Sequence, residues 1–221
     1  MAIKDHEQRW RDWLGTIDQD ITTVYLFRST WLTVGQIVRA NSNIPPSHFF
    51  AYMASIYGTS QALALRRLTD ERKDVVSLAR LVMDLKRHAS QLTLEWWLTL
   101  QDGSEVSDFR QFTKAGMNHF DPAIADEDLT LLRQAVAPVR TYVDHHLAHH
   151  DRDPTKSIPT FGDIHAALDS VGGVFRRYYA LLTGADRPIM VPVPQPGWHL
   201  PFTVPWLPPG TPPPKLEGTI S

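Results

Sequence analysis

The helical pattern of the first forty residues constrains the fold more than any other feature. One row of residues recurs there at alternating spacings of four and three: Trp10, Leu14, Ile17, Ile21, Val24, Arg28, Trp31, Gly35 and Val38. This spacing places the row on one side of a single long helix over residues 5–40. No segment shows a convincing period of two, so we expect an all-α protein. Arg28, which interrupts the apolar row, is expected to pair with a buried carboxylate or to reach solvent.

Stop and start signals mark the next two helices. Asn41–Asn43 and the prolines that follow end the first helix, because proline cannot continue a helix and Asn and Ser favour turns. Ser47 is the expected N-cap of a second helix over residues 48–68. A third helix is expected over residues 75–88. The apolar residues expected on one face of this third helix are Val75, Leu78, Leu81, Val82 and Leu85.

The middle of the chain is less regular. Residues 92–120 predict one or two shorter helices, broken near Asp102–Gly103. Asp126–Asp128 form an acidic cluster of the kind that suits a helix N-terminus, where negative charge is favourable. The apolar pattern then continues to about His150, with Pro138 as an expected kink or restart.

A last helix has signals at both ends. Thr160-x-x-Asp163 resembles a capping box with Asp in place of Glu, and the pattern ends near Gly184. Gly172–Gly173 lies inside this amphipathic pattern, which indicates close helix packing rather than nucleotide binding.

The composition changes after residue 185, so we predict a helical domain over residues 1–185 and an extended tail over residues 186–221. The tail holds eleven of the 17 prolines and is expected to be largely polyproline-like. Its apolar residues, among them Trp198 and Trp206, are too many for a simple linker. A strap lying across the protein's own helices is the favoured interpretation, and a docking strip for a partner is the alternative.

Composition excludes several function classes. The 221 residues hold no cysteine, which excludes a disulfide framework, a thiolate nucleophile and cysteine-based zinc sites. The net charge of −2 gives no global sign of a nucleic-acid binder but leaves room for a local basic patch. The charged start lacks an apolar signal core, and no run approaches the roughly 18 apolar residues of a membrane span. We expect a cytoplasmic protein with no membrane segment and no cofactor.

Residues 139–151, with the sequence VRTYVDHHLAHHD, stand apart because four of the ten histidines fall within six residues. On a helix, His145 and His149 are four apart and share a face. They could hold a metal ion, with Asp144 or Asp151 as a third ligand. No separate ligand set stands out, so a metal site is not the favoured interpretation.

Two other interpretations of the histidines remain. They could form a structural cluster at a helix end, where protonated histidine suits the helix dipole. They could also act in acid–base chemistry with Arg140 and Arg152 nearby. Cleavage of RNA by its own 2′-hydroxyl needs a histidine to move a proton and a guanidinium to stabilise the phosphate oxygens, and it needs no metal. This third interpretation is favoured.

Three short motifs carry a family resemblance. Ala64–Asp70 (ALRRLTD), followed by Val76–Val82 (VSLARLV), resembles the RLxD…SLxxLL segment of the AbiU-like branch of the HEPN superfamily. Arg140–Asp151, which ends in AHHD, is similar to the branch's arginine-then-AHxD segment. Thr160–Asp163 (TFGD) resembles the start of its final helix. The resemblance spans roughly residues 9–184.

The resemblance implies an up-and-down helical bundle that dimerises so that two copies of its motif face each other. Active members are metal-independent endoribonucleases of toxin–antitoxin or abortive-infection systems, with an Arg-x(4 to 6)-His motif. Arg140 would be the arginine; His145 fits the four-residue spacing and His146 the five-residue spacing. If His149 is instead the AHxD histidine, Arg140 lies nine residues before it, about 180° around a straight helix. Val143 then stands where the arginine is expected.

The implied catalytic roles follow. His145 or His149 would be the general base, Arg140 would stabilise the phosphorane, and Asp144 would orient them as the polar residue that often follows the family's arginine. The alternative is a catalytically inactive HEPN-like module that holds RNA, a nucleotide or a protein. A cognate antitoxin or nucleotidyltransferase is an expected partner.

The expected RNA contacts are Arg66, Arg67, His146 and Arg152. Residues 66–87 hold seven basic and four acidic side chains, an excess of three positive charges. A solvated helix face is the default explanation of such a run, and a phosphate-binding rim beside the arginine of the motif is the other.

Overall fold

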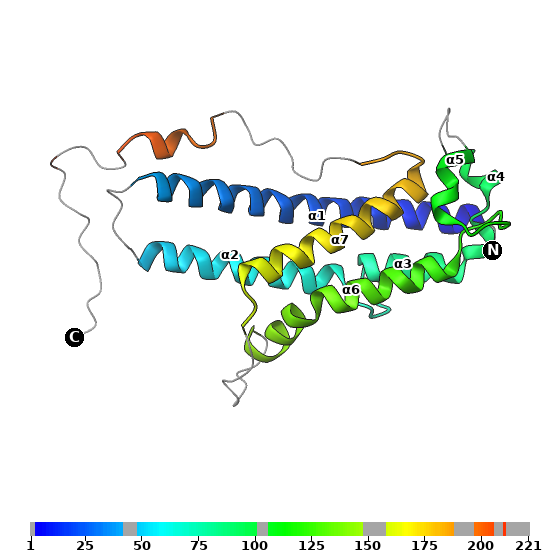
Figure 1. Cartoon of the computed structure of the whole chain (residues 1–221), viewed down its shortest axis with the longest axis horizontal. Helices are drawn as coiled ribbons and strands as arrows, with labels where there is room; N and C mark the ends of the chain where they lie inside the picture. The colour runs from blue at the N-terminus through cyan, green and yellow to red at the C-terminus, as the bar shows by residue number, and fades with distance from the viewer. Residues whose placement is uncertain are drawn as a thin grey trace.

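The computed structural model describes residues 3–41, 48–100, 106–147, 158–187, 197–205 and 210. Five long helices run back and forth along one axis: α1 (Ile3–Ala40), α2 (His48–Leu68), α3 (Leu78–Arg87), α6 (Pro122–Tyr142) and α7 (Phe161–Thr183) (Figure 1). Within the described residues, pairing of the β type is limited to one bridge between Thr93 and His119. The predicted all-α, up-and-down bundle is confirmed. Across that same part of the chain, no helix combines the length and apolar character that crossing a membrane requires.

The apolar row of α1 forms one wall of the core. Trp10, Leu14, Ile17, Ile21 and Val24 are all buried. They pack against residues of α2, α3, α6 and α7 in one continuous cluster. The predicted long first helix is therefore confirmed, and burial of its apolar side explains its stability better than intrinsic helix propensity does.

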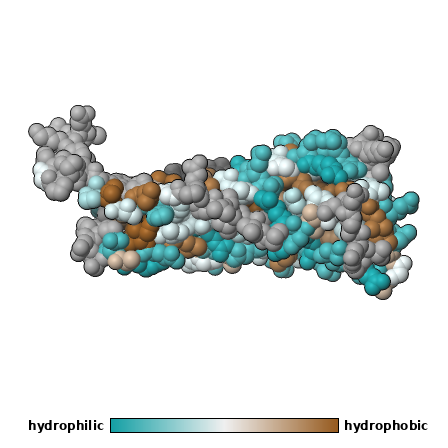
Figure 2. All heavy atoms as spheres, turned by 90° about the horizontal axis from the view of Figure 1, so that it is seen from above, coloured by the Kyte–Doolittle hydropathy of each residue, from teal (hydrophilic) through white to brown (hydrophobic). Residues whose placement is uncertain are grey.

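The C-terminal end of α1 and the N-terminal part of α2 extend as a two-helix arm beyond α6 and α7 (Figure 1). Arg28 lies at the base of the arm and pairs with Asp169 of α7, a largely exposed carboxylate instead of the expected buried one. Apolar atoms reach the surface on the arm (Figure 2). The exposed large apolar residues of α2 are Phe49, Tyr52, Met53, Ile56 and Leu63.

The third helix begins later than the sequence pattern predicts. Ser77 is its N-cap, and its Oγ accepts a hydrogen bond from the backbone N–H of Arg80 at 3.0 Å. The same hydroxyl donates to the backbone carbonyl of Asp70. Val75 therefore lies in the connection before the helix, and the prediction that it shares the helix face was wrong. The serine hydroxyl decides the boundary because it satisfies an N–H that would otherwise have no partner.

The helix over residues 122–142 begins earlier than predicted. Asp121 is the N-cap of α6, its carboxylate accepts from the N–H of Ala123 at 2.9 Å, and Pro122 occupies the first turn. The acidic cluster predicted to mark the N-terminus lies inside the helix instead. Asp128 is buried there and pairs with Arg177 of α7. The position of the Asp128 carboxylate is therefore explained by its pairing with Arg177 and not by the helix dipole.

The end of α6 also differs from the prediction. Pro138 stays within the helix, and the α-helical part ends at Tyr142 rather than near His150. A π-helical segment, Val143–Leu147, follows directly. Such segments are rare and occur mostly as single turns, often at functional sites.

The last long helix agrees with its sequence signals. Thr160 and Asp163 form the predicted capping box, with the Asp163 N–H donating to Thr160 Oγ1 at 3.2 Å and the Thr160 N–H donating to the Asp163 carboxylate at 2.8 Å. Gly184 ends the helix in the left-handed conformation, with a φ of 70°.

Gly172 allows α7 to approach α1. A Cβ at this position would overlap the hydroxyl of Tyr25, which donates to the Leu168 carbonyl at 3.3 Å. A Cβ at Gly173 would meet nothing within 4 Å. The close packing predicted for this glycine pair therefore belongs to Gly172 alone.

These two glycines give a matched test of helix packing. Gly172→Ala is expected to lower the free energy of unfolding by about 1–2 kcal/mol, because overpacking outweighs the gain in helix propensity. Gly173→Ala is expected to raise it by about 0.5–1 kcal/mol. Adding Tyr25→Phe to Gly172→Ala removes the overlapping hydroxyl and should recover most of the loss. Urea unfolding of the wild type and the three variants measures these differences; equal effects at the two glycines would contradict the close approach.

The segment between α3 and α6 is built of short turns. It contains α4 (Leu94–Trp97) and α5 (Val106–Phe109) with 3₁₀ turns beside them. The predicted break at Asp102–Gly103 lies outside the described residues, as does Ser47.

Arg187 holds the start of the tail against α1 and α7. Arg187 Nε lies 2.7 Å from Asp18 Oδ1 of α1, and its NH2 donates to Thr22 Oγ1 at 2.8 Å. Its guanidinium also stacks over the Tyr179 ring, 5.7 Å from the centroid. Beyond it, residues 197–205 include one 3₁₀ turn, Leu200–Thr203, and most of the tail lies outside the described residues. The strap remains a prediction.

Candidate functional site

The structure brings Arg140 and Asp144 together where α6 ends. Arg140 Nε lies 3.7 Å from Asp144 Oδ2, one helical turn along the chain. Asp144 also accepts a hydrogen bond from Arg66 Nε of α2 at 3.3 Å. The Asp144 carboxylate thus lies between two guanidinium groups from different helices. The side chains of Arg140 and Asp144 are 51% and 43% exposed, so these pairs contribute little to stability but leave the group open to a ligand.

Asp70 continues this network into the connection between α2 and α3. Its Oδ2 lies 3.0 Å from Arg66 NH1 and 3.0 Å from Arg72 Nε, and its Oδ1 accepts the Arg72 backbone N–H at 3.0 Å. Burial raises the pKa of the Asp70 carboxyl, but these hydrogen bonds outweigh burial and lower the pKa below its ordinary value. Burial similarly lowers the pKa of Arg66, and its bonds to Asp70 and Asp144 raise it overall. Both groups therefore stay charged and hold each other in place.

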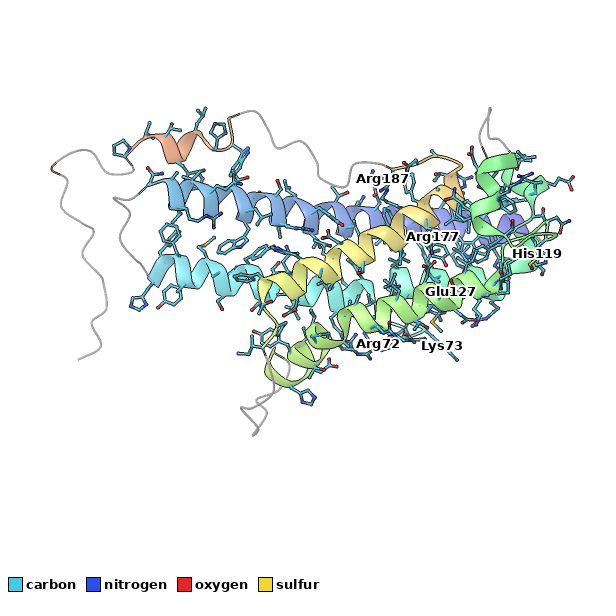
Figure 3. The ribbon with its side chains drawn as sticks, in the orientation of Figure 1. Arg72, Lys73, His119, Glu127, Arg177 and Arg187 are labelled. Atoms are coloured by element: carbon cyan, nitrogen blue, oxygen red, sulfur yellow. The ribbon has the colours of Figure 1, made fainter. Side chains whose placement is uncertain are left out.

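A second arginine of α6 lies two turns before Arg140. Arg133 binds Glu71 through two hydrogen bonds, of 2.7 and 3.1 Å. The bond from Arg133 is the main cause of a lowered pKa at Glu71, and the charge of Arg140 contributes. Figure 3 shows Arg72 and Lys73 beside this part of α6, at the connection from α2 to α3.

These groups form one surface, which we call the arginine–carboxylate cluster. Its members are Arg66, Asp70, Glu71, Arg72, Arg133, Arg140 and Asp144. Four arginines face three carboxylates, so one positive charge is in excess. Partly exposed arginines held by acids are suited to bind phosphate oxygens, which guanidinium groups recognise through paired hydrogen bonds.

His145 lies beside the cluster, within the π-helical segment, and is half-buried. A pocket of about 410 Å³ lies next to Tyr142, the last residue of α6, and is lined by residues of α2, of the start of α7 and of the connection before it. The His146 side chain, and His149 and Arg152 altogether, lie outside the described residues. The alternative metal site on His145 and His149, with Asp144 or Asp151 as a third ligand, therefore includes residues that the structure does not describe.

The basic run of residues 66–87 divides among several surfaces. Arg67 pairs with Asp20 of α1 at 2.7 Å, on a different side of α2 from Arg66, because adjacent residues on a helix are about 100° apart. Arg80 is buried in α3, and Lys86 pairs with Asp126 of α6. Among the run's arginines, Arg66 and Arg72 belong to the arginine–carboxylate cluster.

Sequence reasoning did not single out Arg133 or Glu71. The seven-residue spacing from Arg133 to Arg140 is a signal that could have placed both arginines on one face of a helix. The pairing of Glu71 with Arg133 is a tertiary contact and leaves no such pattern in the sequence.

Comparison with known proteins identifies one family. The model of the AbiU2 family of HEPN proteins matches residues 8–195, most of the chain. The match extends eleven residues past Gly184 and into the proline-rich tail. Searches of the curated proteins and of the solved structures each found no match.

Proposed function

Because the chain belongs to the AbiU2 family of HEPN proteins, we propose that it is a metal-independent endoribonuclease of a bacterial phage-defence or toxin–antitoxin system. The observation that carries the proposal is the position of Arg140, beside Asp144 and five residues before His145. This order provides an arginine for the phosphate and a histidine for the proton within one short segment.

The proposed reaction is attack of the RNA's own 2′-oxygen on the adjacent phosphorus. His145, or His149 in the alternative assignment, takes the proton of the 2′-hydroxyl. Arg140 stabilises the negative charge on the phosphorane oxygens as the bond to the 5′-oxygen breaks. Asp144 holds the Arg140 guanidinium in position and takes no proton. The 5′-oxygen takes a proton from water as it leaves, so the products are a 2′,3′-cyclic phosphate and a 5′-hydroxyl.

RNA would bind across the arginine–carboxylate cluster. Arg66 lies within the cluster, and its contacts with Asp70 and Asp144 fix its guanidinium near Arg140. His146 and Arg152 follow in the same segment and are proposed as further contacts. Arg67 lies on another side of α2 and would meet only an RNA that wraps around that helix.

We further propose that the protein works as a cytoplasmic homodimer in which both copies contribute to one cleft. The exposed apolar residues of α2, such as Tyr52 and Ile56, support an interface on the two-helix arm, because exposed apolar patches often mark protein contacts. A cognate antitoxin or nucleotidyltransferase would be the regulatory partner.

The direct test is cleavage of total cellular RNA by the purified full-length protein in excess EDTA. Cleavage is expected to survive EDTA and to fall by roughly 10²- to 10³-fold in Arg140→Ala, the cost of losing one stabilising donor. Arg176→Ala is the matched control, an arginine of similar exposure on α7 that pairs with Asp186 and is not a member of the arginine–carboxylate cluster. Arg176→Ala should cleave as the wild type does. Equal cleavage by Arg140→Ala would contradict the role of Arg140, and no cleavage by the wild type at any concentration would contradict a nuclease.

A catalytically inactive binding module is the second candidate. One observation favours it: the Asp144 carboxylate, which accepts from Arg66, also lies close enough to Arg140 to neutralise part of its charge. In that case the cluster would hold RNA, a nucleotide or a protein without cutting. RNA binding that weakens with salt and with Arg140→Ala, in the absence of cleavage, would identify this function.

A further inference from the structure

The start of α1 and the end of α3 lie at the other end of the bundle from the end of α6 (Figure 1), whose last turn holds Arg140, and a second group of titratable side chains lies at these two helix ends. His6 of α1, Asp84 of α3 and His88, the residue that ends α3, come together there. One potential ligand atom from each lies within 4.8 Å of the others. His6 and Asp84 are buried, and the His88 side chain is 16% exposed.

His88 is already oriented as a metal-binding histidine would be. Its Nδ1 lies 2.8 Å from the backbone carbonyl oxygen of Asp84, which can only accept, so Nδ1 carries the proton. In the neutral ring, Nε2 therefore keeps its lone pair. Metal-bound histidines generally donate their second ring nitrogen to a carbonyl or carboxylate in this way. The His6 ring lies against it, with ring centroids 4.1 Å apart.

The Arg9 guanidinium provides a positive charge at the same group. Its NH2 binds Asp84 Oδ2 and lies 3.3 Å from His6 Nδ1, so one cation contacts two of the three candidate ligands. Trp10 Nε1 donates to the same carboxylate oxygen at 2.7 Å and fixes its orientation. The Arg9 side chain is 38% exposed, which lets it move into solvent without disturbing the core.

We propose that His6, Asp84 and His88 form a binding site for Zn²⁺, and that the metal displaces the Arg9 guanidinium. Two imidazoles and one carboxylate, with water in the fourth position, are a donor set that Zn²⁺ accepts in proteins. Mg²⁺ and Ca²⁺ prefer sites made of oxygen ligands and fit this group less well. Because its ligands come from both helices, the bound metal would join the start of α1 to the end of α3.

The site is independent of the proposed ribonuclease activity. The metal would contact neither Arg140 nor His145, which lie where α6 ends, so RNA cleavage that survives EDTA is compatible with a metal that stabilises the fold. Loss of zinc would loosen the contact between α1 and α3, and loss of Arg140 would not.

The test uses the full-length protein, stripped with EDTA, dialysed and titrated with Zn²⁺ alone against a chromophoric chelator. We expect one equivalent to bind, with affinity lowered at least about 100-fold in His6→Gln and in His88→Gln. Arg9→Gln should bind roughly tenfold more tightly, because the cation nearest to the ligands is gone, although Arg87 stays 3.6 Å from the other Asp84 oxygen. Because Arg9 is not a ligand, this gain in affinity still tests the site if the ligand variants fail to fold. Circular dichroism checks each variant.

Two controls separate this site from other histidines. His165→Gln changes a histidine bound to Tyr57, 2.7 Å from its hydroxyl, and should leave zinc affinity unchanged. The double variant His145→Ala/His149→Ala should also bind zinc as the wild type does. Binding lost in that variant, binding unchanged in both His6→Gln and His88→Gln, or affinity unaltered by Arg9→Gln would each overturn the proposal.

Discussion

Substitution of His145 by alanine is expected to reduce the rate of RNA cleavage by roughly 10²- to 10⁴-fold, the usual contribution of a positioned general base. His145 directly follows Asp144, the carboxylate that holds Arg140 and Arg66, and the proposed mechanism requires its ring to reach the RNA whose phosphate these arginines bind. Single-turnover cleavage of a short RNA measures the loss. Added imidazole should restore part of the rate, because it can take the proton that the missing side chain took.

The same assay decides between the two histidine assignments. His149→Ala should keep most of the activity if Arg140 and His145 are the working pair. The opposite result, with His149→Ala inactive and His145→Ala active, would assign catalysis to the AHxD histidine. Asp144→Asn is a useful third variant because it keeps the shape of the side chain while weakening its hold on both arginines. A large loss there with normal folding would support the positioning role of Asp144.

Removal of the Arg177 side chain is expected to destabilise the fold by about 3 kcal/mol. Arg177 of α7 pairs with Asp128 of α6, and Figure 3 shows it between the two helices. Asp128 is buried, so Arg177→Ala leaves a carboxylate in the core without its counter-charge, which typically costs several kcal/mol. Arg176→Ala is the matched control. Its partner Asp186 is exposed, so the loss there should stay below about 1 kcal/mol.

The pH dependence of the free energy of unfolding gives an independent check of the Asp128–Arg177 pair. Burial raises the pKa of Asp128 above its ordinary value, although the Arg177 charge opposes the shift. The folded protein therefore binds a proton at Asp128 more readily than the unfolded chain, so this group contributes more stability as the pH falls. The loss caused by Arg177→Ala should be larger at pH 8 than at pH 5. Urea unfolding at both values measures it, and a pH-independent loss would mean that Asp128 stays ionised without its partner.

The fold was largely predictable because helical spacing is a local signal. The buried row of α1 and the capping box of α7 followed from residue order alone, since both depend on neighbours within a few turns. The errors arose where two local signals competed. Val75 continues an apolar pattern, but the Ser77 hydroxyl sets the helix start. The acids at 126–128 suit an N-terminus, but Asp121 followed by proline is the stronger cap.

The candidate site was predictable only in part. Arg140 and Asp144 are four residues apart, so their contact follows from helical geometry. That Arg66 rather than Arg67 reaches Asp144 depends on how α2 is rotated against α6, which no short motif reports. The sequence did not indicate the proposed Zn²⁺ site for the same reason. His6 and His88 are distant in sequence and become neighbours only when α1 packs on α3.

The π-helical segment after Tyr142 affects how this site can evolve. A π turn bonds each residue to the fifth one along, so it accommodates one residue more than an α turn. Removing one residue from Val143–Leu147 would restore α geometry there, and because the turn already held one residue more, the side chains after it would keep their directions relative to Arg140. The segment thus gives the chain a place beside Arg140 where one residue can be lost or gained while the helices of the core stay where they are.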